Sequence, residues 1–472
     1  MVATFYEPLS YLDASFLALE TRTLHMHVAA VAIFDAAELK RPDGGIDIDR
    51  IRGHIDGKLQ YIPRYRQRLG YMPLNRRPVW IDDDDFNLDY HVRHSSLPKP
   101  GTDEQLKALA GRVVGQQLDR DKPLWELLVV EGLEGDRFAL IAKIHHCMID
   151  GISGVDLTTT LLNVVPTSDI EQGGAWSPRP APTPTQLTVS EMARTARRAI
   201  DSLGSAGEAI TSGRDRLGRA AQRVGAAANS LKSGWLTAAD RTPLNPEIGP
   251  NRRFEWTDMD LASIKEIKNA LGGTVNDIVL TIVAGGVRHY LETERDYSVS
   301  KTEFRVMAPV SVRKPGQRGT LGNQVAMWLV NLPISDPDPR RRLAAIRSET
   351  KRLKATNQAL GAATMVDLSK GTPIPVLSLA ARVVSNAIRP FNMTVTNVPG
   401  PQFPMYLLEA RMLVNYPIVP LWGQHGLGIA LFSYDGRLLW GIHTDYDAVP
   451  DPAAVARSLQ HSFKTLLNAS TD

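Results

Sequence analysis

The sequence lacks several features that whole classes of protein need. It contains a single cysteine, Cys147, among 472 residues. One cysteine excludes an internal disulfide and suits a reducing compartment, and we interpret this one as a small buried residue. No run of about 18 apolar residues occurs, and residues 1–10 have no basic stretch followed by an apolar core. We therefore predict neither a membrane-spanning helix nor a secretory leader, and expect a cytoplasmic protein.

The net charge and the reactive side chains exclude further classes of function. A formal net charge of only +3 argues against a basic surface for nucleic acid. No His, Cys and carboxylate cluster has the spacing of a closed metal site, and the four adjacent carboxylates of residues 82–85 cannot converge on one ion. A Gly-x-Ser-x-Gly nucleophile elbow is also missing. We predict no metal, no bound cofactor and no acyl-enzyme intermediate.

What is present is ordinary for a large globular protein. Hydrophobic residues make up 43% of the chain and charged residues 22%, and the length allows two large domains. Residues 166–185 are rich in Pro, Thr, Ser and Gly, which marks a linker. From Val189 to Leu231, apolar and small residues recur at heptad spacing, with arginines on the other faces. This segment is interpreted either as a helical connector between two halves or as an amphipathic helix that docks on anionic lipid.

The most informative stretch follows the apolar run 138–144 and contains His145, His146 and Asp150. Neighbouring side chains of a strand point to opposite faces, so one histidine would face a cleft and the other the body of the protein if the strand continued. His146 and Asp150 are separated by a bend that Gly151 allows. Neutral imidazole is suited to take a proton from a hydroxyl near neutral pH, so general-base catalysis is one interpretation. Metal ligation and a structural role are the alternatives.

Local patterns also predict parts of the framework. The apolar spacing between Ile48 and Leu69 is typical of a helix. Thr274 and Asp277 have the spacing of a capping box, which predicts a helix start. Short apolar runs predict strands, two of them joined as a hairpin, and a helical pattern closes the chain. The expected strands cover 29–34, 304–312, 325–332, 393–398, 428–432 and 438–443, and the closing helix covers 453–467.

Residues 145–151, His-His-Cys-Met-Ile-Asp-Gly, resemble the HHxxxDG signature of the condensation-type, coenzyme A-dependent acyltransferases. Within that group the chain is most similar to the bacterial wax ester synthase/diacylglycerol acyltransferase family. Other segments match the same family in chain order. They are Leu9–Leu17, Met26-His27-Val28, Pro123-Leu124-Trp125, Asn276-Asp277 and Asn397-Val398-Pro399-Gly400-Pro401.

The resemblance implies an α/β fold of two chloramphenicol-acetyltransferase-like halves. Each half would be a mixed sheet flanked by helices, with an active-site tunnel at their interface. The first half, residues 1–170, would carry the signature, and the second would cover residues 251–472. Residues 171–250 would form the Pro-rich linker and the basic helical connector. The change in composition at residues 166–185 supports a two-domain division independently.

The resemblance also implies transfer of a long-chain acyl group from acyl-coenzyme A, the co-substrate, to diacylglycerol or a fatty alcohol. The products would be triacylglycerol or wax ester. His146 would be the base, and the catalytic set would also contain His145, Asp150, Gly151 and Asn276. Six residues are expected to bind substrate: Trp125, Asp277, Ser311, Asn397, Pro399 and Gly400. From the residues alone, the tryptophan fits a core strand, the Asn-Asp pair a helix start and the Pro-Gly-Pro run a turn.

Two other functions are left open by the sequence. One is acyl transfer, on the same fold, to a polyketide or peptide held by a carrier protein. The other is a non-catalytic protein of the lipid-droplet surface that uses the arginine-rich segment. Peripheral attachment to a membrane or lipid droplet is also open for the enzyme itself.

Overall fold

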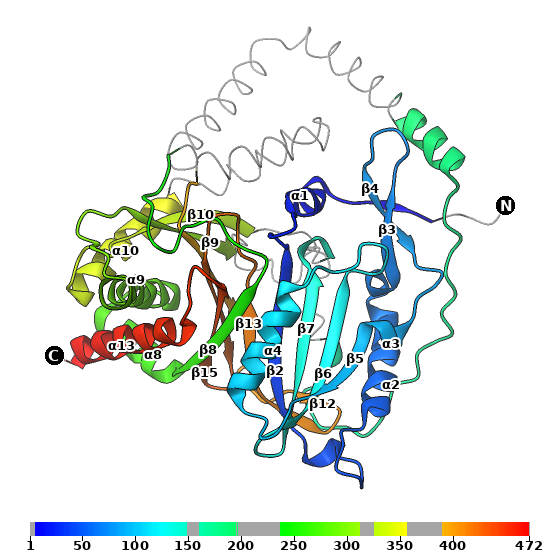
Figure 1. Ribbon diagram of the computed structural model, residues 1–472, viewed down its shortest axis with the longest axis horizontal. Helices are drawn as coiled ribbons and strands as arrows, with labels where there is room; N and C mark the ends of the chain where they lie inside the picture. Colours follow the sequence, from blue (N-terminus) through cyan, green and yellow to red (C-terminus); the bar gives the residue numbers. More distant parts are fainter. Residues whose placement is uncertain are drawn as a thin grey trace.

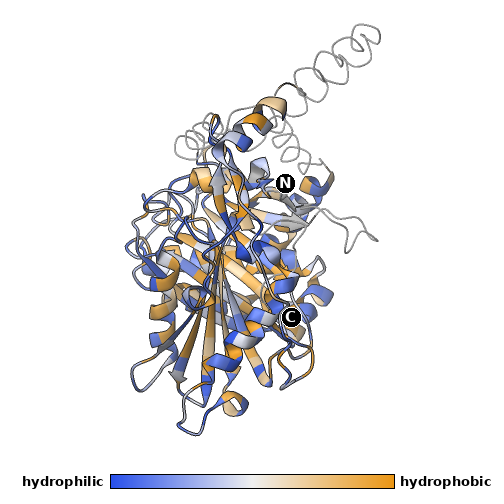
Figure 2. Ribbon diagram, turned by 90° about the vertical axis from the view of Figure 1, so that its right-hand side faces the viewer, coloured by the Kyte–Doolittle hydropathy of each residue, from blue (hydrophilic) through white to orange (hydrophobic). Residues whose placement is uncertain are grey.

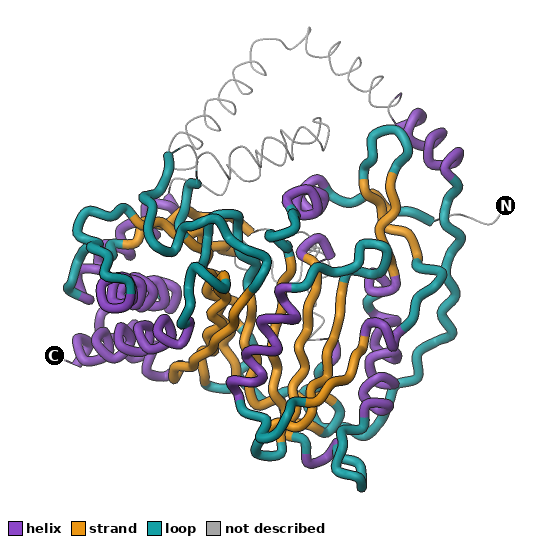
Figure 3. Tube along the Cα trace, in the orientation of Figure 1, coloured by secondary structure: helices purple, strands orange, loops and turns teal. Residues whose placement is uncertain are grey.

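The protein is built as two α/β halves that lie side by side (Figure 1). A computed structural model describes residues 5–148, 160–194, 196, 237–311, 325–355 and 389–471. Within these residues each half has a six-stranded sheet that contains both parallel and antiparallel pairs, and helices lie outside the sheets (Figure 3). The prediction of two α/β halves with mixed sheets is confirmed.

The first sheet has the strand order β12-β13-β2-β7-β6-β5. β6 and β7 form a hairpin whose turn places Gly135 and Asp136 at positive φ. β2 pairs antiparallel with β7 in a register that sets His27 opposite His145. The strands are β2 (His27–Asp35), β5 (Val92–Ser96), β6 (Trp125–Leu133), β7 (Arg137–His145), β12 (Tyr406–Leu407) and β13 (Ala410–Ile418).

Short helices and a small sheet surround the first half. α1 (Tyr11–Leu19) begins after Ser10, whose hydroxyl accepts a hydrogen bond from the Asp13 N–H. The other helices are α2 (Ile48–Lys58), α3 (Leu88–His91) and α4 (Asp103–Gly115), with 3-10 turns η1 (Ala37–Leu39), η2 (Leu59–Tyr61), η3 (Pro63–Arg66) and η4 (His146–Met148). The small sheet, in the order β1-β4-β3, contains β1 (Glu7–Pro8), β3 (Gln67–Tyr71) and β4 (Pro78–Asp82).

The helix predicted between Ile48 and Leu69 is wrong in its second part. α2 ends at Lys58, and the chain continues through η2 and η3 into β3, which contains Leu69. Ile62, with φ −129° and ψ 64°, precedes Pro63, whose ring disfavours a helical residue before it. Pro63 also lacks the N–H that a continuing helix needs. The apolar residues of this stretch share one core although they do not share one helix.

The second sheet has the strand order β10-β9-β11-β14-β15-β8. Its strands are β8 (Arg252–Asp260), β9 (Phe304–Ser311), β10 (Val325–Leu332), β11 (Met393–Pro399), β14 (Leu427–Tyr434) and β15 (Arg437–Asp445). The helices on one face of it are α8 (Leu261–Leu271), α9 (Val275–Glu294), α10 (Pro339–Ala355) and α13 (Pro452–Thr471) (Figure 1). The predicted β14–β15 hairpin and closing helix are confirmed.

The second half contributes a pair of strands to the first sheet. β12 and β13 follow β11 in the chain but add to the first sheet, where β13 pairs with β2. β13 also packs closely on β15 of the second sheet, since a Cβ at Gly441 would overlap the carbonyl oxygen of Pro417. α4 packs on β8, where a Cβ at Gly111 would lie 2.8 Å from Arg252 O. The division of the chain at residues 170 and 250 stays a proposal. The first sheet does not respect this division, because β13 comes from the second half.

Apolar residues concentrate in the central strands, and hydrophilic residues dominate the outer loops (Figure 2). Phe254 and Trp256 of β8 belong to the buried cluster of the first half, so the core is continuous across the boundary. Among the described residues, no helix is by itself long and apolar enough to cross a bilayer. α8 and α9 reach that length and composition only as a pair, which is bent by 98°.

Candidate active site

His146 lies at the point where β7 ends. His145 is the last residue of the strand and His146 begins η4, so the strand alternation considered for the two histidines does not extend through both. The His146 N–H donates to Met26 O at 2.7 Å, and the His146 ring stacks on Phe16 with centroids 4.0 Å apart. Burial lowers the pKa of His146 to about 4. The imidazole is therefore neutral at pH 7, and its Nδ1 has no hydrogen-bond partner among the described residues.

His145 faces a buried carboxylate that the sequence did not indicate. Glu20 Oε1 lies 3.2 Å from His145 Nε2 and 3.5 Å from His27 Nε2, and Glu20 Oε2 lies 2.7 Å from a guanidinium nitrogen of Arg120. Burial by itself would raise the pKa of Glu20, but these three partners outweigh it and hold that pKa well below its usual range. Glu20 is a buried anion. The only signal for it in the sequence is a glutamate after an apolar helix, which does not by itself indicate burial.

After His146, the structure describes only Cys147 and Met148 of the signature. Cys147 is buried, and burial raises the pKa of its thiol well above the ordinary value. The interpretation of Cys147 as a small buried residue is confirmed. Asp150 and Gly151 lie outside the described residues, so the carboxylate expected near His146 stays a prediction. In the described part of the chain, no group of three or more His, Cys, Asp and Glu side chains could hold a metal ion.

Asn276 and Asp277 occupy the first turn of α9. The Thr274 hydroxyl accepts from the Asp277 N–H, and Asp277 Oδ2 accepts from the Thr274 N–H, so the predicted capping box is confirmed. Asp277 Oδ1 accepts from Thr350 Oγ1 at 2.8 Å, which ties α9 to α10. The Asp277 carboxylate is thus engaged on both oxygens, and Asn276 beside it is half-buried. Contact of either residue with substrate stays a prediction.

The Asn-Val-Pro-Gly-Pro run ends β11 and leaves the sheet. β11 pairs parallel with β14 up to Pro399, which is exposed, whereas Asn397 is half-buried. The Gly400 N–H donates to Ser433 Oγ at 3.1 Å. A Cβ at Gly400 would overlap the Phe432 ring and the backbone oxygen of Ser433, so the turn requires glycine at this position. The contribution of this turn to a substrate site stays a prediction.

Trp125 is fully buried in the first half. Its Nε1 donates to Tyr65 O at 2.7 Å, and its indole stacks on His91 with centroids 4.6 Å apart. These contacts give Trp125 a core position, and its predicted contact with substrate is untested. Ser311 is the last residue of β9, where its backbone pairs with Val325 of β10.

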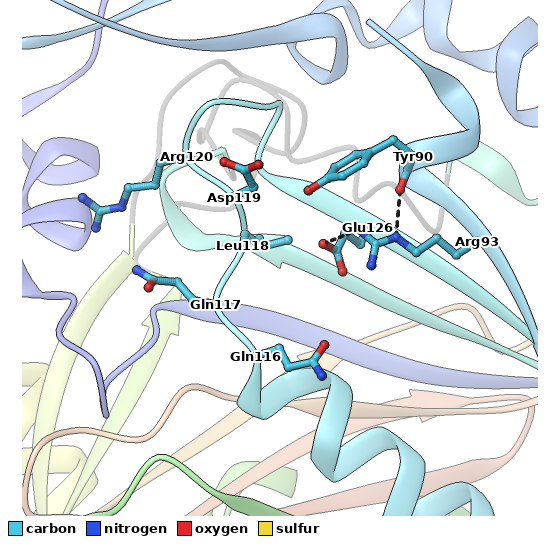
Figure 4. A pocket seen from close by; sticks show the side chains of 8 residues that line it. All are labelled: Tyr90, Arg93, Gln116, Gln117, Leu118, Asp119, Arg120 and Glu126. Atoms are coloured by element: carbon cyan, nitrogen blue, oxygen red, sulfur yellow. Dashed lines mark hydrogen bonds and ion pairs between the residues drawn. The ribbon is translucent and has the colours of Figure 1, made fainter.

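A polar cavity of about 510 Å³ opens beside the Glu20 contacts (Figure 4). It is lined by Tyr90, Arg93, Gln116, Gln117, Leu118, Asp119, Arg120 and Glu126. Arg93 lies 3.2 Å from Glu126, so these two charges compensate each other. Gln117 and Arg120 contact Glu20 at 3.3 and 2.7 Å. None of the residues predicted to bind substrate lines this cavity.

Two family models match the chain. Residues 9–279 match the wax ester synthase/diacylglycerol acyltransferase catalytic domain, and residues 321–467 match the WS/DGAT C-terminal domain. A putative diacylglycerol O-acyltransferase of Mycobacterium tuberculosis (strain CDC 1551 / Oshkosh) is 31% identical over 485 residues, which covers 99% of this chain and 91% of that protein. A probable diacylglycerol O-acyltransferase of Mycobacterium tuberculosis (strain H37Rv) is 30% identical over 464 residues, which covers 98% and 96%.

Solved structures share the fold. The wax ester synthase/diacylglycerol acyltransferase from Marinobacter aquaeolei VT8 matches with a TM-score of 0.67 at 24% identity, covering 98% of this chain and 100% of that chain. The starter condensation domain of rhizomide synthetase matches with a TM-score of 0.58 at 13% identity, covering 99% and 95%. At these identities the likeness establishes the architecture alone, and it confirms the predicted condensation-type fold.

Proposed function

The chain belongs to the wax ester synthase/diacylglycerol acyltransferase family, and on this premise we propose that it transfers a long-chain acyl group from acyl-coenzyme A to the hydroxyl of diacylglycerol or of a fatty alcohol. The products are triacylglycerol and wax ester. The match to the catalytic domain includes the whole histidine signature at residues 145–151. The observation that carries the proposal is the neutral His146 imidazole at the end of β7, whose Nδ1 no described residue occupies.

His146 acts as the general base. It accepts the hydroxyl proton as the acceptor oxygen attacks the thioester carbonyl, and the carbon–sulfur bond then breaks. A buried imidazolium with a pKa of about 4 is a strong acid, so it returns the proton readily to the departing thiolate. A thiol has an ordinary pKa of about 8.5, which makes that return downhill. The overall step forms ester and free coenzyme A without an acyl-enzyme.

The other predicted residues take supporting roles in this proposal. The Asn276 amide, or backbone N–H groups, would stabilise the oxyanion that forms on the carbonyl. Asp150 and Gly151 would shape the bend after His146. The segments at Ser311 and at Asn397, Pro399 and Gly400 would form walls of the tunnel. Trp125 and Asp277 would act from the framework, since their polar groups are engaged within the protein.

The acceptors are lipids, and one surface of the protein is suited to meet a lipid layer. Leu74 in the β3–β4 connection donates its N–H to Glu191 at 3.4 Å, which brings that connection beside the helix of residues 184–194. The Arg76 guanidinium lies over the ring of Tyr71 at 5.1 Å. Four large apolar side chains on these two elements are 37–62% exposed: Tyr71, Leu74, Val189 and Met192. Its apolar and basic side chains support the proposal that the protein attaches peripherally to anionic lipid through this surface.

Attachment is tested with vesicles of phosphatidylcholine and phosphatidylglycerol. Sedimentation of the protein with them should weaken about tenfold in the double variant Leu74→Ser/Met192→Ser, because each side chain would bury apolar area in the lipid. Val164→Ser/Val165→Ser is the matched control, since both valines are 61% exposed elsewhere. Equal loss in both variants would contradict attachment through this surface. Most of the heptad pattern predicted over residues 189–231 lies outside the described residues, so its two interpretations stay predictions.

The reaction is tested by free-thiol release from palmitoyl-coenzyme A with purified protein, in the presence of diacylglycerol or hexadecanol. We expect thiol release together with ester product, and loss of both in His146→Ala. The alcohol that supports turnover decides between triacylglycerol and wax ester synthesis. A folded protein that forms no ester with either alcohol would refute the lipid reaction, and acyl donors bound to a carrier protein would then be the next substrates.

A further inference from the structure

Glu20 anchors two short chains of polar contacts that end on the backbone N–H groups of His146 and Cys147. In the first chain, the Met26 N–H donates to Glu20 Oε1 at 3.0 Å, and Met26 O accepts from the His146 N–H at 2.7 Å. In the second, Glu20 Oε1 lies 3.2 Å from His145 Nε2, and His145 Nδ1 accepts from the Cys147 N–H at 3.1 Å. Both chains therefore start from the same atom, Glu20 Oε1.

The second chain fixes the position of the proton on His145. Nδ1 accepts a hydrogen bond from Cys147 and so carries no proton itself. The neutral ring must then hold its proton on Nε2, which faces the Glu20 carboxylate. A carboxylate in this position selects the tautomer and orients the ring. His145 thus turns one ring nitrogen to the Cys147 N–H and the other to the Glu20 carboxylate, which leaves His146 as the histidine of the pair available to a substrate.

Helix α1 supports both histidines at once. Glu20 directly follows this helix, and Phe16, one turn earlier, stacks on the His146 ring. The second oxygen of Glu20 accepts from Arg120 at 2.7 Å and from Gln117 at 3.3 Å. The Glu20 side chain is only 1% exposed. A buried carboxylate with partners on both oxygens has a fixed position, so it can also fix the position of the groups bonded to it.

We propose that Glu20 is a positioning residue for acyl transfer, which sets the backbone at His146 and Cys147 and thereby aims the His146 imidazole at the reacting hydroxyl. The inference rests on the proposed function, in which His146 is the base. A displacement of about 1 Å in a reacting group can lower a rate about 100-fold. Glu20 therefore affects the chemical step much more than the affinity for acyl-coenzyme A.

Three substitutions isolate this role: Glu20→Ala, which removes the carboxylate, Glu20→Gln and His145→Asn. Glu20→Gln keeps the shape and one acceptor oxygen, and Arg120 retains a hydrogen bond to Leu17 O at 2.9 Å, so its charge is not left without a partner. His145→Asn keeps an acceptor near the position of Nδ1 but removes the ring nitrogen that faces Glu20. Glu38 is exposed in η1 and supplies the matched controls Glu38→Gln and Glu38→Ala.

Thiol release from palmitoyl-coenzyme A is measured for each full-length variant, and circular dichroism with thermal unfolding gives the folded fraction. We expect kcat per folded molecule to fall about 100-fold in Glu20→Ala and about tenfold in Glu20→Gln. KM for palmitoyl-coenzyme A should stay within about twofold of wild type. Glu20→Gln and His145→Asn combined should lose less than the product of their separate losses, because both interrupt the same chain of contacts. The Glu38 variants should keep the wild-type kcat.

Wild-type kcat in folded Glu20→Ala and Glu20→Gln would overturn the proposal, and so would losses that multiply in the double variant. A lower folded fraction with unchanged kcat would also overturn it, since Glu20 would then serve stability alone. If Glu20→Ala does not fold, the isosteric Glu20→Gln decides. His146→Ala in the same assay separates the two proposals: its activity would refute the base, whereas an inactive His146→Ala with a normal Glu20→Gln would refute only the role of Glu20.

Discussion

His146 in the first half and His425 in the second half have similar surroundings, but different contacts hold their rings. Each ring stacks on a phenylalanine, Phe16 at 4.0 Å and Phe391 at 4.3 Å, and burial lowers each pKa to about 4. His425 Nε2 lies 2.7 Å from Phe391 O, a contact that fixes this ring to the backbone. His146 Nδ1 has no such partner among the described residues. A low pKa therefore reports burial in both halves. Within the described part of the chain Nδ1 lacks a partner in both rings, so the Nε2 contact that holds His425 is what separates it from the candidate base.

Different charged groups lie near the two histidines. Behind the turn that carries His146, the first half places the buried carboxylate of Glu20. Near His425 the second half places the Arg389 guanidinium, which adds to burial in lowering the pKa of that histidine. A cation opposes the formation of an imidazolium beside it. Arg389 therefore helps to keep His425 neutral, whereas Glu20 reaches the His146 turn through backbone contacts.

The largest expected difference is in catalysis. His146→Ala should lower kcat about 10²- to 10⁴-fold, the range of a positioned general base. His425→Ala should stay within about threefold of wild type per folded molecule, because its ring takes no part in proton transfer. Thiol release normalised to folded protein measures both. Equal losses in the two variants would remove the distinction between the two histidines.

The pH dependence of kcat/KM sharpens the same comparison. An enzyme whose base has a pKa of about 4 keeps about 90% of its activity at pH 5, whereas a base at the ordinary value of about 6.5 keeps about 3%. We expect activity to fall only as the pH drops through about 4, as His146 gains its proton. Stopped assays between pH 4 and 8, on protein shown to be folded at each pH, measure this limb. A limb near pH 6.5 would show that the ring is more hydrated than the structure indicates.

In the free energy of unfolding, we expect His425→Ala to have the larger effect of the two histidine variants. At pH 7, His425→Ala should lower the free energy of unfolding by about 1–3 kcal/mol, because Phe391 O loses its buried partner. The loss should shrink as the pH falls from about 6.5 to about 4, since unfolded wild type gains a proton at His425 while the folded protein remains neutral there. Urea unfolding at several pH values tests this. A pH-independent difference would contradict a neutral, buried His425.

The smallest expected effect concerns the stacked phenylalanines. Phe16→Leu and Phe391→Leu each remove an aromatic contact worth about 0.5–1.5 kcal/mol. Only Phe16→Leu should also raise the pKa seen in the kcat/KM profile, because it lets water reach His146. Unfolding and pH–rate measurements on the two variants form the test. A shifted profile in Phe391→Leu would show that the two sites are coupled.

Short-range patterns predicted much of the framework. The capping box of Thr274 and Asp277, the hairpin of β14 and β15 and the closing helix α13 are confirmed. Each of these depends on residues close in the chain, whose spacing is visible in the sequence. The prediction of one helix between Ile48 and Leu69 was wrong. The apolar spacing there indicates which residues are buried, but Pro63 cannot continue a helix, so the chain forms a 3-10 turn there instead.

For the candidate site, the sequence predicted the reactive group but not its surroundings. The histidine signature indicated a neutral imidazole as base, and the family comparison agrees with the resemblance on which that role was based. The end of the strand at His145 was not visible in the sequence, because an apolar run does not mark where pairing stops. Glu20 was missed because its partner Arg120 lies 100 residues away in the chain.

The sequence by itself determined which reactive groups this protein carries, the family to which it belongs and most of the local elements, because these follow from residue identity and near-neighbour spacing. Only the tertiary structure decided which ring nitrogens are occupied, that Glu20 is buried behind His145, and that β13 joins the sheet of the first half. These features depend on contacts between segments far apart in the chain, and burial and hydrogen bonding exist only once those segments meet.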